Sequence, residues 1–545
     1  MNLGKPLESY VAEVLSRTSK VAANHLKSAM HGIVVLNNFE DASIDFQTFD
    51  WKSGPGNRNW WWQLQQLPFA RWYTQSVGTV SKQDDHAAIV DFIYESISQW
   101  RKCEAAYKKE SPLIWHDHAT ALRLKHLTDL SVALHGLEYD HAKLMDLLAK
   151  EVERHALWLV PEKNYSRRTN HGFEQADILL RTTLIFHECK ELDRPRAVSR
   201  ERLEDEVAYA FTEQGVHKEN SPAYHQFMIT KLKTLTDYEG LNDEYMASLG
   251  NQYLDKARGF LEAITLPDGT LPIIGDTQGG EVSRASNLPV REGGGTPLDS
   301  AGCRIWDYAE SGYVVVEYID NESQEEAKLI VRSGQFSHYH RHDDDMSIYW
   351  QIGSRVILGD GGLYSHNESD PKRCFLRSSL AHNTVFVNGA EAKREIRSLS
   401  RRGRLQLKSD PDRIIAITNY FSGWELRRVI NIEKLRQGRL LIEDQATSED
   451  LSGIAATNWF HPSTSESFRS LGDDEYGLAL ADGLRLIVSS PSSASEVKMY
   501  TGWSGDGRYS AISSEKFGIE NDASRLVLLW NAPGKIRTVL KLIRH

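Results

Sequence analysis

Two histidines separated by one residue, His340 and His342, begin the run of side chains best suited to chemistry in this sequence. The sequence around them predicts β-strands, and residues i and i+2 of a strand project to the same face. We therefore expect both imidazoles in one pocket. Asp360 and His382 follow near later predicted strands. The set His342, Asp360 and His382 would suit one divalent metal, zinc or manganese, with His340 left for chemistry. A hydrogen-bonded cluster without metal is the alternative.

A second candidate site reads Arg167-Arg168-Thr169-Asn170-His171-Gly172-Phe173-Glu174. The amide of Asn170, the imidazole of His171 and a guanidinium such as that of Arg168 could neutralise a carboxylate of a substrate. Glu174, one helical turn later, could orient one of these groups. The alternative interpretation is that Asn170 caps a helix beside a solvated basic loop.

Tyr224 is the third candidate, because Pro222 favours the start of a helix and would place Tyr224 in its first turns. In a cationic pocket the pKa of this tyrosine would fall from its ordinary value of about 10, and the phenolate could act as a base. A packing role is the alternative.

Aromatic and basic runs could contact a sugar polymer. Trp60-Trp61-Trp62 cannot all face one core, so at least one, which we take as Trp61, is expected to line a cleft and stack on a sugar ring. Arg377, near Lys372-Arg373, is expected to bind an anionic substrate, and Lys393-Arg394 and Arg401-Arg402 could line the same channel. Core packing and solvated charged faces are the alternatives.

The elements that must position these residues change character along the chain. Helical periodicity is seen up to about residue 285, which suits an α/α toroid or a bundle of helical hairpins. The predicted helices are His86–Cys103, His116–Gly136, His141–Leu159, Gln175–Cys189 and Lys231–Ile264. After a Gly/Pro-rich linker, the hydrophobic period becomes two, which indicates an antiparallel β-sandwich. The predicted strands are Tyr313–Tyr318, Ala327–Val331, Met346–Ile352, Thr384–Val387, Arg413–Tyr420, Arg439–Glu443, Leu484–Val488 and Leu526–Trp530.

Composition excludes several classes of protein. With 545 residues and a net charge of −11, the chain is large enough for two domains and is not a generic binder of nucleic acid or anionic membranes. Its four cysteines form no CxxC pattern, so we expect free thiols. No secretory signal and no membrane-spanning stretch are recognised, which predicts a cytoplasmic protein or a mature periplasmic one. Whether the chain forms a homodimer stays open.

Together these segments resemble the heparinase II/III group of polysaccharide lyases, and within it the heparinase III branch. Six segments occur in the family's order and at similar separations over about residues 50 to 400. They are RTNHGFEQA (168–176), ENSPAYHQ (219–226), LPIIGD (271–276), HYHRHDDDMSIYW (338–350), VILGDGGLY (356–364) and AHNTVFVNG (381–389). The resemblance implies an α+β multidomain fold. An α/α toroid, an incomplete barrel of helical hairpins, would occupy residues 1–288, followed by a linker at 289–300 and an antiparallel β-sandwich at 301–545.

The resemblance also implies an activity, β-elimination in a uronate-containing polysaccharide, and a role for each candidate. Asn170 and His171 would neutralise the uronate carboxylate, and Tyr224 and His340 would share the proton transfers. Tyr224 could make both transfers where the C5 proton and O4 lie on the same side of the sugar; otherwise His340 would be the base and Tyr224 the acid. His342, Asp360 and His382 match the family's metal ligands. Glu174 matches a site glutamate of some members, and Tyr364 is aligned with a second tyrosine of alginate-cleaving members. The site is then expected between the two domains.

The substrate expected from the resemblance is an anionic polysaccharide, first of all a glycosaminoglycan such as heparan sulfate, hyaluronan or chondroitin. Three alternatives stay open. The first is a lyase for alginate or a bacterial exopolysaccharide. The second is a uronate C5-epimerase, which shares the abstraction of the C5 proton. The third is a polysaccharide-binding protein without catalysis.

Overall fold

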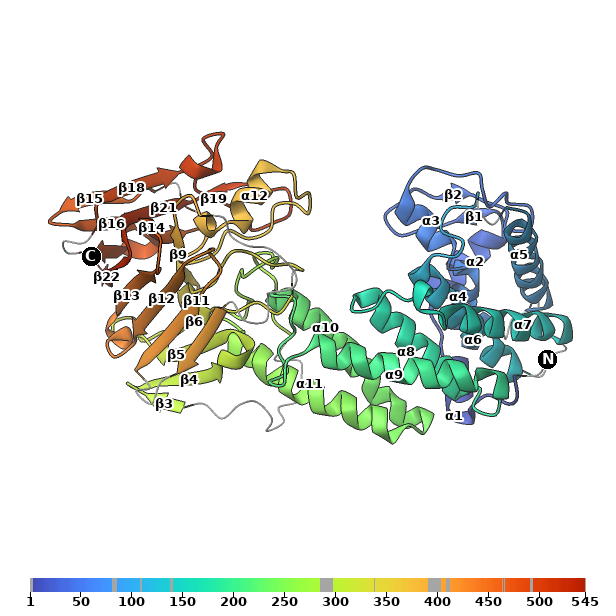
Figure 1. Ribbon diagram of the computed structural model, residues 1–545. Coiled ribbons are helices and arrows are strands. Elements are labelled where there is room, and N and C mark those ends of the chain that lie inside the picture. Colours follow the sequence, from blue (N-terminus) through green and yellow to red (C-terminus); the bar gives the residue numbers. More distant parts are fainter. Residues whose placement is uncertain are drawn as a thin grey trace. The chain divides into compact units, whose positions relative to one another are not determined.

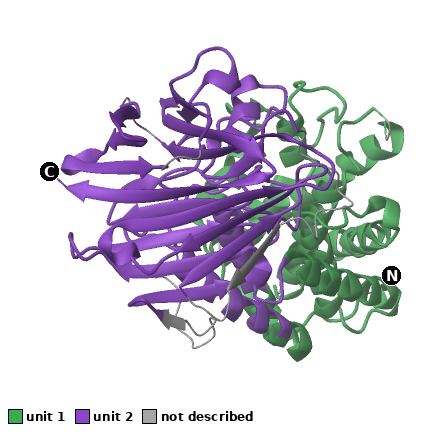
Figure 2. Cartoon of the chain, turned by 60° about the vertical axis from the view of Figure 1, so that its left-hand side comes forward, with its two compact units in different colours: residues 1–210, 235–248 green, residues 211–234, 249–545 purple. Residues whose placement is uncertain are grey.

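The structure, a computed structural model, divides the chain into two compact units (Figure 2). Unit 1 comprises residues 1–210 and 235–248, and unit 2 comprises residues 211–234 and 249–545. The described residues are 3–80, 86–107, 110–137, 141–284, 298–337, 339–390, 403–407, 412–462, 464, 466–490 and 494–544. The basic pairs Lys393-Arg394 and Arg401-Arg402, and most of the predicted linker, lie outside them.

Unit 1 is built from helices that pack against their neighbours along the chain, such as α6 on α7 and α8 on α9 (Figure 1). Each helix buries one apolar face; α7, for example, buries Leu144, Leu148, Val152 and Leu159. The helices are α1 (Glu8–Leu15), α2 (Lys20–Met30), α3 (Arg58–Leu64), α4 (Pro68–Val80), α5 (His86–Tyr107), α6 (Asp117–His135), α7 (Ala142–Leu159), α8 (Asn170–Ile185) and α9 (Asp193–Ala210). The short strands β1 (Ile33–Val34) and β2 (Ala42–Ser43) form a hairpin.

One predicted helix was wrong, because the segment Lys231–Ile264 contains two helices. These are α10 (Pro222–Thr236) and α11 (Glu244–Ile264). A 3₁₀ turn at Asp237–Leu241 separates them and ends at Asn242, whose φ of 59° places it in the left-handed region. Asparagine tolerates this conformation and often terminates a helix, a signal that apolar periodicity alone does not carry.

Unit 2 contains three large antiparallel sheets (Figure 1). The six-stranded sheet has the order β3 (Leu298–Ser300), β4 (Cys303–Tyr308), β5 (Tyr313–Ile319), β6 (Glu326–Arg332), β7 (Ser347–Ile352), β8 (Arg355–Leu358). The eight-stranded sheet has the order β10 (Gly403–Leu407), β11 (Arg413–Thr418), β12 (Glu425–Asn431), β13 (Arg439–Thr447), β22 (Gly534–Arg544), β17 (Leu484–Ser489), β16 (Glu475–Ala479), β15 (Arg469–Gly472). The four-stranded sheet has the order β18 (Glu496–Thr501), β21 (Ser524–Ala532), β14 (Gly453–His461), β9 (Val385–Val387). The pair β19 (Ile512–Ser513) and β20 (Asn521–Asp522) and the helix α12 (Pro371–Arg377) complete the unit.

A single core joins the three sheets, since Trp350, Trp459 and Leu440 belong to one buried cluster. The opposite face of the six-stranded sheet packs against α11, where Ile330 and Phe260 share a second cluster. Alternating residues of a strand face opposite sides, so β6 can serve both cores. This packing fixes the strand ends that carry the candidate site.

The predicted fold class, an α/α toroid of helices followed by an antiparallel β-sandwich, is confirmed. Every predicted strand overlaps an observed one. The last three residues of the predicted linker, Leu298–Ser300, are strand β3, which pairs with β4. All four cysteines are free, as expected. None of the described helices combines the length and apolar character that crossing a membrane requires.

Candidate active site

The candidate residues of unit 2 lie where three chain segments meet at one end of the sandwich. One segment is the turn before α10, one is the loop that follows α11, and one is the connection between β6 and β7. They pack so closely at Gly275 that a Cβ atom there would lie 2.4 Å from the Asn220 carbonyl oxygen and 2.8 Å from the His340 carbonyl oxygen. Gly275 also has a φ of 56°, so two independent constraints demand glycine at this position.

The pair His340 and His342 does not lie on a strand, so this expectation was wrong. Both residues belong to the connection between β6 and β7, and His340 has a φ of 53° in a turn. The aspartates after His342 do not extend a β-strand. Asp345, for example, accepts a hydrogen bond from the Gly334 N–H within the same connection. The two imidazoles nevertheless converge, because both reach the carboxylate of Asp276.

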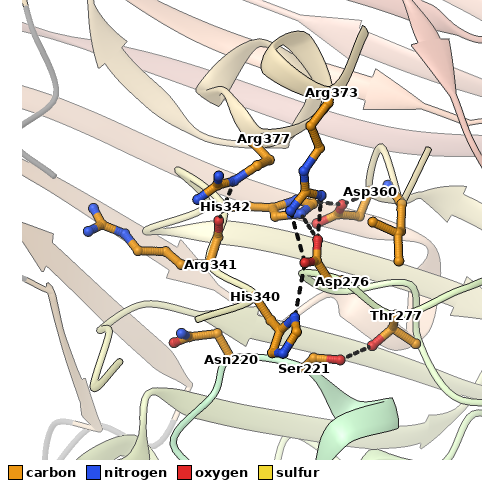
Figure 3. Close-up of polar contacts among 12 residues, drawn as sticks. Asn220, Ser221, Asp276, Thr277, His340, Arg341, His342, Asp360, Arg373 and Arg377 are labelled. Atoms are coloured by element: carbon orange, nitrogen blue, oxygen red, sulfur yellow. Dashed lines mark hydrogen bonds and ion pairs between the residues drawn. The ribbon is translucent and has the colours of Figure 1, made fainter. Parts of the chain in front are cut away.

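Asp276 is the centre of this arrangement (Figure 3). One carboxylate oxygen lies 3.1 Å from His340 Nδ1, and the other lies 2.9 Å from His342 Nε2. The guanidinium of Arg373 contacts both oxygens, with Nη2 at 2.9 Å. Burial raises the pKa of Asp276, but the hydrogen bonds from His340, His342 and Arg373 outweigh it and hold the pKa well below its usual range. Asp276 is therefore a carboxylate that only accepts hydrogen bonds.

The contact with Asp276 selects the tautomer of a neutral His340 ring. Its Nδ1 must donate to Asp276, so the lone pair of the neutral ring lies on Nε2. The carboxylate of Glu219 is 3.5 Å from that Nε2. The ring of Tyr224 stacks on the His340 ring, with centroids 3.5 Å apart and planes inclined by 18°. Tyr224 and His340, which the resemblance paired, are thus direct neighbours.

The pKa of Tyr224 is raised, which contradicts the expected lowering. Burial is the main cause, the charges of Asp276 and Glu219 add to it, and Arg373 opposes it. The expected lowering assumed a cationic pocket, whereas the acidic side chains of Asp276 and Glu219 lie near Tyr224 and Arg373 is paired with Asp276. As expected, α10 begins at Pro222 and carries Tyr224 in its first turn.

Asn220 ties the turn before α10 to the connection between β6 and β7. Its amide nitrogen donates to the carbonyl oxygens of Ser337 and Tyr339, at 2.9 and 3.0 Å. Its amide oxygen accepts from the guanidinium of Arg332 on β6 at 2.8 Å. Asn220 adopts the left-handed region with a φ of 62°. The hydrogen bonds of Asn220 therefore hold together the two segments that carry Tyr224 and His340, in addition to the contact between the two rings.

The predicted metal group is assembled. His342, Asp360 and His382 are buried, and each offers one ligand atom within 4.8 Å of the others. His342 Nδ1 and His382 Nε2 are buried without a hydrogen-bond partner in the part of the chain that the structure describes. The other nitrogens are fixed: His342 Nε2 contacts Asp276 and His382 Nδ1 contacts Asp360. Two buried imidazole nitrogens without a hydrogen-bond partner, in a group that also contains the Asp360 carboxylate, fit a divalent cation.

The second candidate site is in unit 1, at the first turn of α8. The N-cap of α8 is Thr169, whose hydroxyl accepts the Gly172 N–H, so the alternative that Asn170 caps the helix was wrong. Asn170 is the first helical residue and is partly exposed with His171 and Glu174. The start of α6 packs against this turn: the ring of His118 stacks on the His171 ring, and His118 Nε2 contacts the Glu174 carboxylate.

Trp61 is not available to a sugar, because it is only 3% exposed and its indole N–H donates to the Pro55 carbonyl oxygen. On helix α3, Trp60 and Trp61 face the core, and Trp62 remains half-buried. The ring of Trp62 lies 5.3 Å from that of His118. Of the three tryptophans, Trp62 is the one that is not fully buried.

The other predicted contact residues are engaged within the protein. Arg168 is exposed and stacks on the Tyr209 ring at 4.5 Å. Tyr364 is half-buried beneath Lys372, whose Nζ lies 5.3 Å from the ring centroid. Arg377 donates from Nε to the Arg341 carbonyl oxygen and pairs with Glu368.

Sequence reasoning missed Asp276 and Glu219 in unit 2, and it named Arg373 only as part of a basic run. Asp276 and Glu219 lie in two segments that carried the resemblance, but their spacing from His340 gave no hint of contact. In unit 1 it missed His116, Asp117 and His118. These form a second His-x-His pattern, which was interpreted only as the beginning of a helix.

Two family models match the chain. Residues 8–289 match the family model described as the heparinase II/III N-terminus, and residues 301–526 match the model of the heparinase II/III-like C-terminal part. No curated protein matches the sequence.

Solved structures share the fold. A heparan sulfate lyase from Pedobacter heparinus superposes with a TM-score of 0.68 at 15% identity, covering 100% of this chain and 84% of the other. A heparinase III gene product gives a TM-score of 0.70 at 16% identity, covering 100% and 87%. A further heparinase III gives 0.66 at 15% identity, covering 97% and 85%.

Proposed function

The chain belongs to the heparinase II/III family of polysaccharide lyases, and from this premise we propose that it cleaves a uronate-containing glycosaminoglycan by β-elimination. The observation that carries the proposal is the stack of Tyr224 on His340, with His340 fixed by Asp276. Elimination needs a base for the proton on C5 of the uronate and an acid for the departing O4. Two titratable rings in contact supply both.

His340 is proposed as the base. Because Asp276 accepts the Nδ1 proton, His340 Nε2 carries the lone pair that can take the C5 proton. The electron pair of the C5–H bond becomes the C4–C5 double bond, and the C4–O4 bond breaks. Tyr224 is proposed as the acid that protonates O4, since its raised pKa keeps the phenol protonated at neutral pH.

The stack also bears on which uronate fits. Rings whose centroids are 3.5 Å apart approach a sugar from one side. In glucuronate, the C5 proton and O4 lie on the same face of the sugar ring, whereas in iduronate they lie on opposite faces. We therefore propose that glucuronate-containing polymers are the better substrates.

Asn170 and His171 are proposed to neutralise the uronate carboxylate. As the C5 proton leaves, negative charge moves onto that carboxylate, and donors already in place stabilise it. Both side chains are partly exposed at the first turn of α8, where backbone N–H groups also favour an anion. Trp62, rather than Trp61, is proposed as the tryptophan available for a sugar ring.

A divalent cation, zinc or manganese, is proposed for the group His342, Asp360 and His382. When bound, it would supply a fixed positive charge and organise its loop. Asp276 would then accept from the ligand His342 and from the base His340 at once. The chemistry itself is assigned to the side chains of Tyr224 and His340.

Heparan sulfate is the first substrate proposed, because the similar solved structures are named as heparan sulfate lyase and heparinase III. Hyaluronan and chondroitin follow. Alginate and bacterial exopolysaccharides are the alternative polymers.

The experiment incubates the full chain with heparan sulfate, hyaluronan, chondroitin, dermatan and alginate and follows the ultraviolet absorbance of 4,5-unsaturated ends. Absorbance should rise with at least one glucuronate polymer and less with iduronate-rich dermatan. Absence of product from every polymer would reject the lyase.

A uronate C5-epimerase is the second candidate, because it also removes the C5 proton. An epimerase must return a proton to the opposite face of the sugar, and the stacking of Tyr224 on His340 disfavours that. Deuterium incorporation from heavy water at C5, without unsaturated ends, would identify the epimerase. If the parent chain, Tyr224→Phe and His340→Ala all bind polymer equally and none of them forms product, a non-catalytic binding protein is the better account.

A further inference from the structure

His118, a residue of unit 1, has no role in the proposed mechanism. It lies in the first turn of α6, between the Trp62 ring, the His171 ring and the Glu174 carboxylate. Its side chain is 12% exposed, whereas that of His171 is 45% exposed. His118 is therefore the less exposed of two stacked histidines, and His171 is the one that solvent reaches.

The contacts of His118 fix its ring in three ways. The His171 ring lies parallel to it, with centroids 4.2 Å apart and planes inclined by 23°. His118 Nε2 contacts a carboxylate oxygen of Glu174, which lies one turn after His171 on α8. The Trp62 ring, 5.3 Å away, belongs to a third helix, α3. A planar ring held at an edge and on its face has little freedom to rotate.

A second carboxylate, Asp117, acts on His171 from another direction. Its Oδ2 lies 3.7 Å from His171 Nδ1 and accepts the Ser166 hydroxyl, and its Oδ1 lies 2.9 Å from His116 Nδ1. Burial raises the pKa of Asp117, but the contacts with His116, His171 and Ser166 lower it well below its ordinary value. With Nδ1 turned toward Asp117 and one ring face covered by His118, His171 Nε2 is the atom left to meet a substrate.

We propose that His118 is a positioning residue, which holds the His171 ring in the plane required to neutralise a uronate carboxylate. Glu174 anchors His118 rather than the substrate in this arrangement. The inference rests on the proposed function and deepens it. It names a residue that acts on the reaction through His171 alone.

Metal binding is not the explanation for this cluster. Among the described residues, the His, Cys, Asp and Glu side chains grouped closely enough for a metal are His342, Asp360 and His382. The contacts of His118 are instead a ring stack with His171 and a hydrogen bond with the Glu174 carboxylate. A substitution of His118 can remove both contacts, or it can keep one of them and remove the other.

Three substitutions separate these contributions on the polymer that the chain cleaves. His118→Ala removes the stack and the Glu174 contact, and should lower kcat by up to about 100-fold with a smaller change in KM, because misplacement of His171 weakens transition-state stabilisation most. His118→Phe retains a flat ring beneath His171 and should recover much of kcat. His118→Gln retains a donor for Glu174 without the ring, and should recover less.

His135→Ala is the matched control, since His135 is an exposed histidine at the other end of the same helix. It should leave kcat and KM unchanged. Thermal unfolding of each variant separates loss of fold from loss of positioning, and His118→Phe keeps the test informative if His118→Ala unfolds.

The decisive comparison is a double-mutant cycle with His171→Ala. If His118 acts through His171, adding His118→Phe or His118→Ala to His171→Ala should change kcat by less than threefold. Unchanged kcat in folded His118→Ala, or full additivity with His171→Ala, would overturn the inference while leaving the lyase in place. Failure of the parent chain to cleave any polymer would instead reject the proposed function.

Discussion

The two candidate regions are held together in different ways. In unit 2, one buried carboxylate, Asp276, connects the proposed base, a proposed metal ligand and Arg373. In unit 1, pairwise contacts link the first turns of α6 and α8, and His171 and Asn170 stay partly exposed. A buried charge is tolerated only when it is fully paired, so the unit 2 centre must be assembled as a whole. The unit 1 cluster can lose one contact and keep the rest.

This difference matches the tasks proposed for the two regions. Proton transfer needs two groups at fixed separation, which the stack of Tyr224 on His340 and the Asp276 hydrogen bond provide. Neutralising a carboxylate needs donors that an incoming polymer can reach. Substitutions in each region should therefore change kcat and metal content in different ways.

The largest loss is expected from Tyr224→Phe and His340→Ala. Each removes one proton-transfer group, so kcat should fall by about 100-fold to 10,000-fold. Initial rates of unsaturated product formation measure this. Tyr253→Phe, an unrelated tyrosine on α11, is the control and should keep the parent rate. Retention of more than a tenth of kcat in Tyr224→Phe would exclude Tyr224 as the acid.

Asn170→Ala should cost less and act differently. Loss of one donor to the developing charge should lower kcat by about 100-fold, without any change in bound metal. Kinetics and metal analysis of the same preparation measure both quantities. A metal loss that accompanied the drop in kcat would contradict the separation of the two regions.

Asp276→Asn should lower both kcat and metal content, by about 10-fold to 100-fold each, because Asp276 supports His340 and His342 together. Asp360→Asn is the matched comparison, because it removes a metal ligand and leaves the Asp276 contact with His340 in place. It should lose metal to the same degree but retain more kcat. Equal kcat in the two variants would show that Asp276 acts only through the metal.

The smallest effects are expected from alanine substitutions at Gly275 and Gly280, two glycines of the loop after α11, which should change the free energy of unfolding. Gly275→Ala should lower the free energy of unfolding by about 1–3 kcal/mol, because φ is positive and the new Cβ would clash with two carbonyl oxygens. Gly280→Ala shares the positive φ but meets no atom within 4 Å, and should cost only the backbone strain of about 1 kcal/mol. Denaturant unfolding compares them; equal losses would show that the close approach at Gly275 is unimportant.

Much of the fold was predictable from hydrophobic period alone. The change from a helical period to a period of two separates the helical part from the sandwich, and each predicted strand lies on an observed strand. The break between α10 and α11 was missed because it depends on the left-handed Asn242, not on apolar spacing. The placement of His340 on a strand failed because it rested on the i, i+2 spacing of two histidines, whereas the three aspartates that follow disfavour a strand.

The site was predictable as a set of residue types but not as a network. The group His342, Asp360 and His382 was found because Asp360 and His382 lie beside predicted strands, although His342 lies in a loop and not on the predicted strand. Asp276 is 64 residues from His340 in sequence, and only the fold reveals their contact. The direction of the Tyr224 pKa shift depends on that same contact and could not be inferred from local charge.

The most direct test of the central claim is deuterium at C5 of uncleaved polymer after incubation in heavy water. With Tyr224→Phe, His340 should still remove the C5 proton, so deuterium should enter the polymer without unsaturated ends. With His340→Ala, neither deuterium nor unsaturated ends should form. Deuterium in His340→Ala but not in Tyr224→Phe would assign the base to Tyr224 and contradict this account.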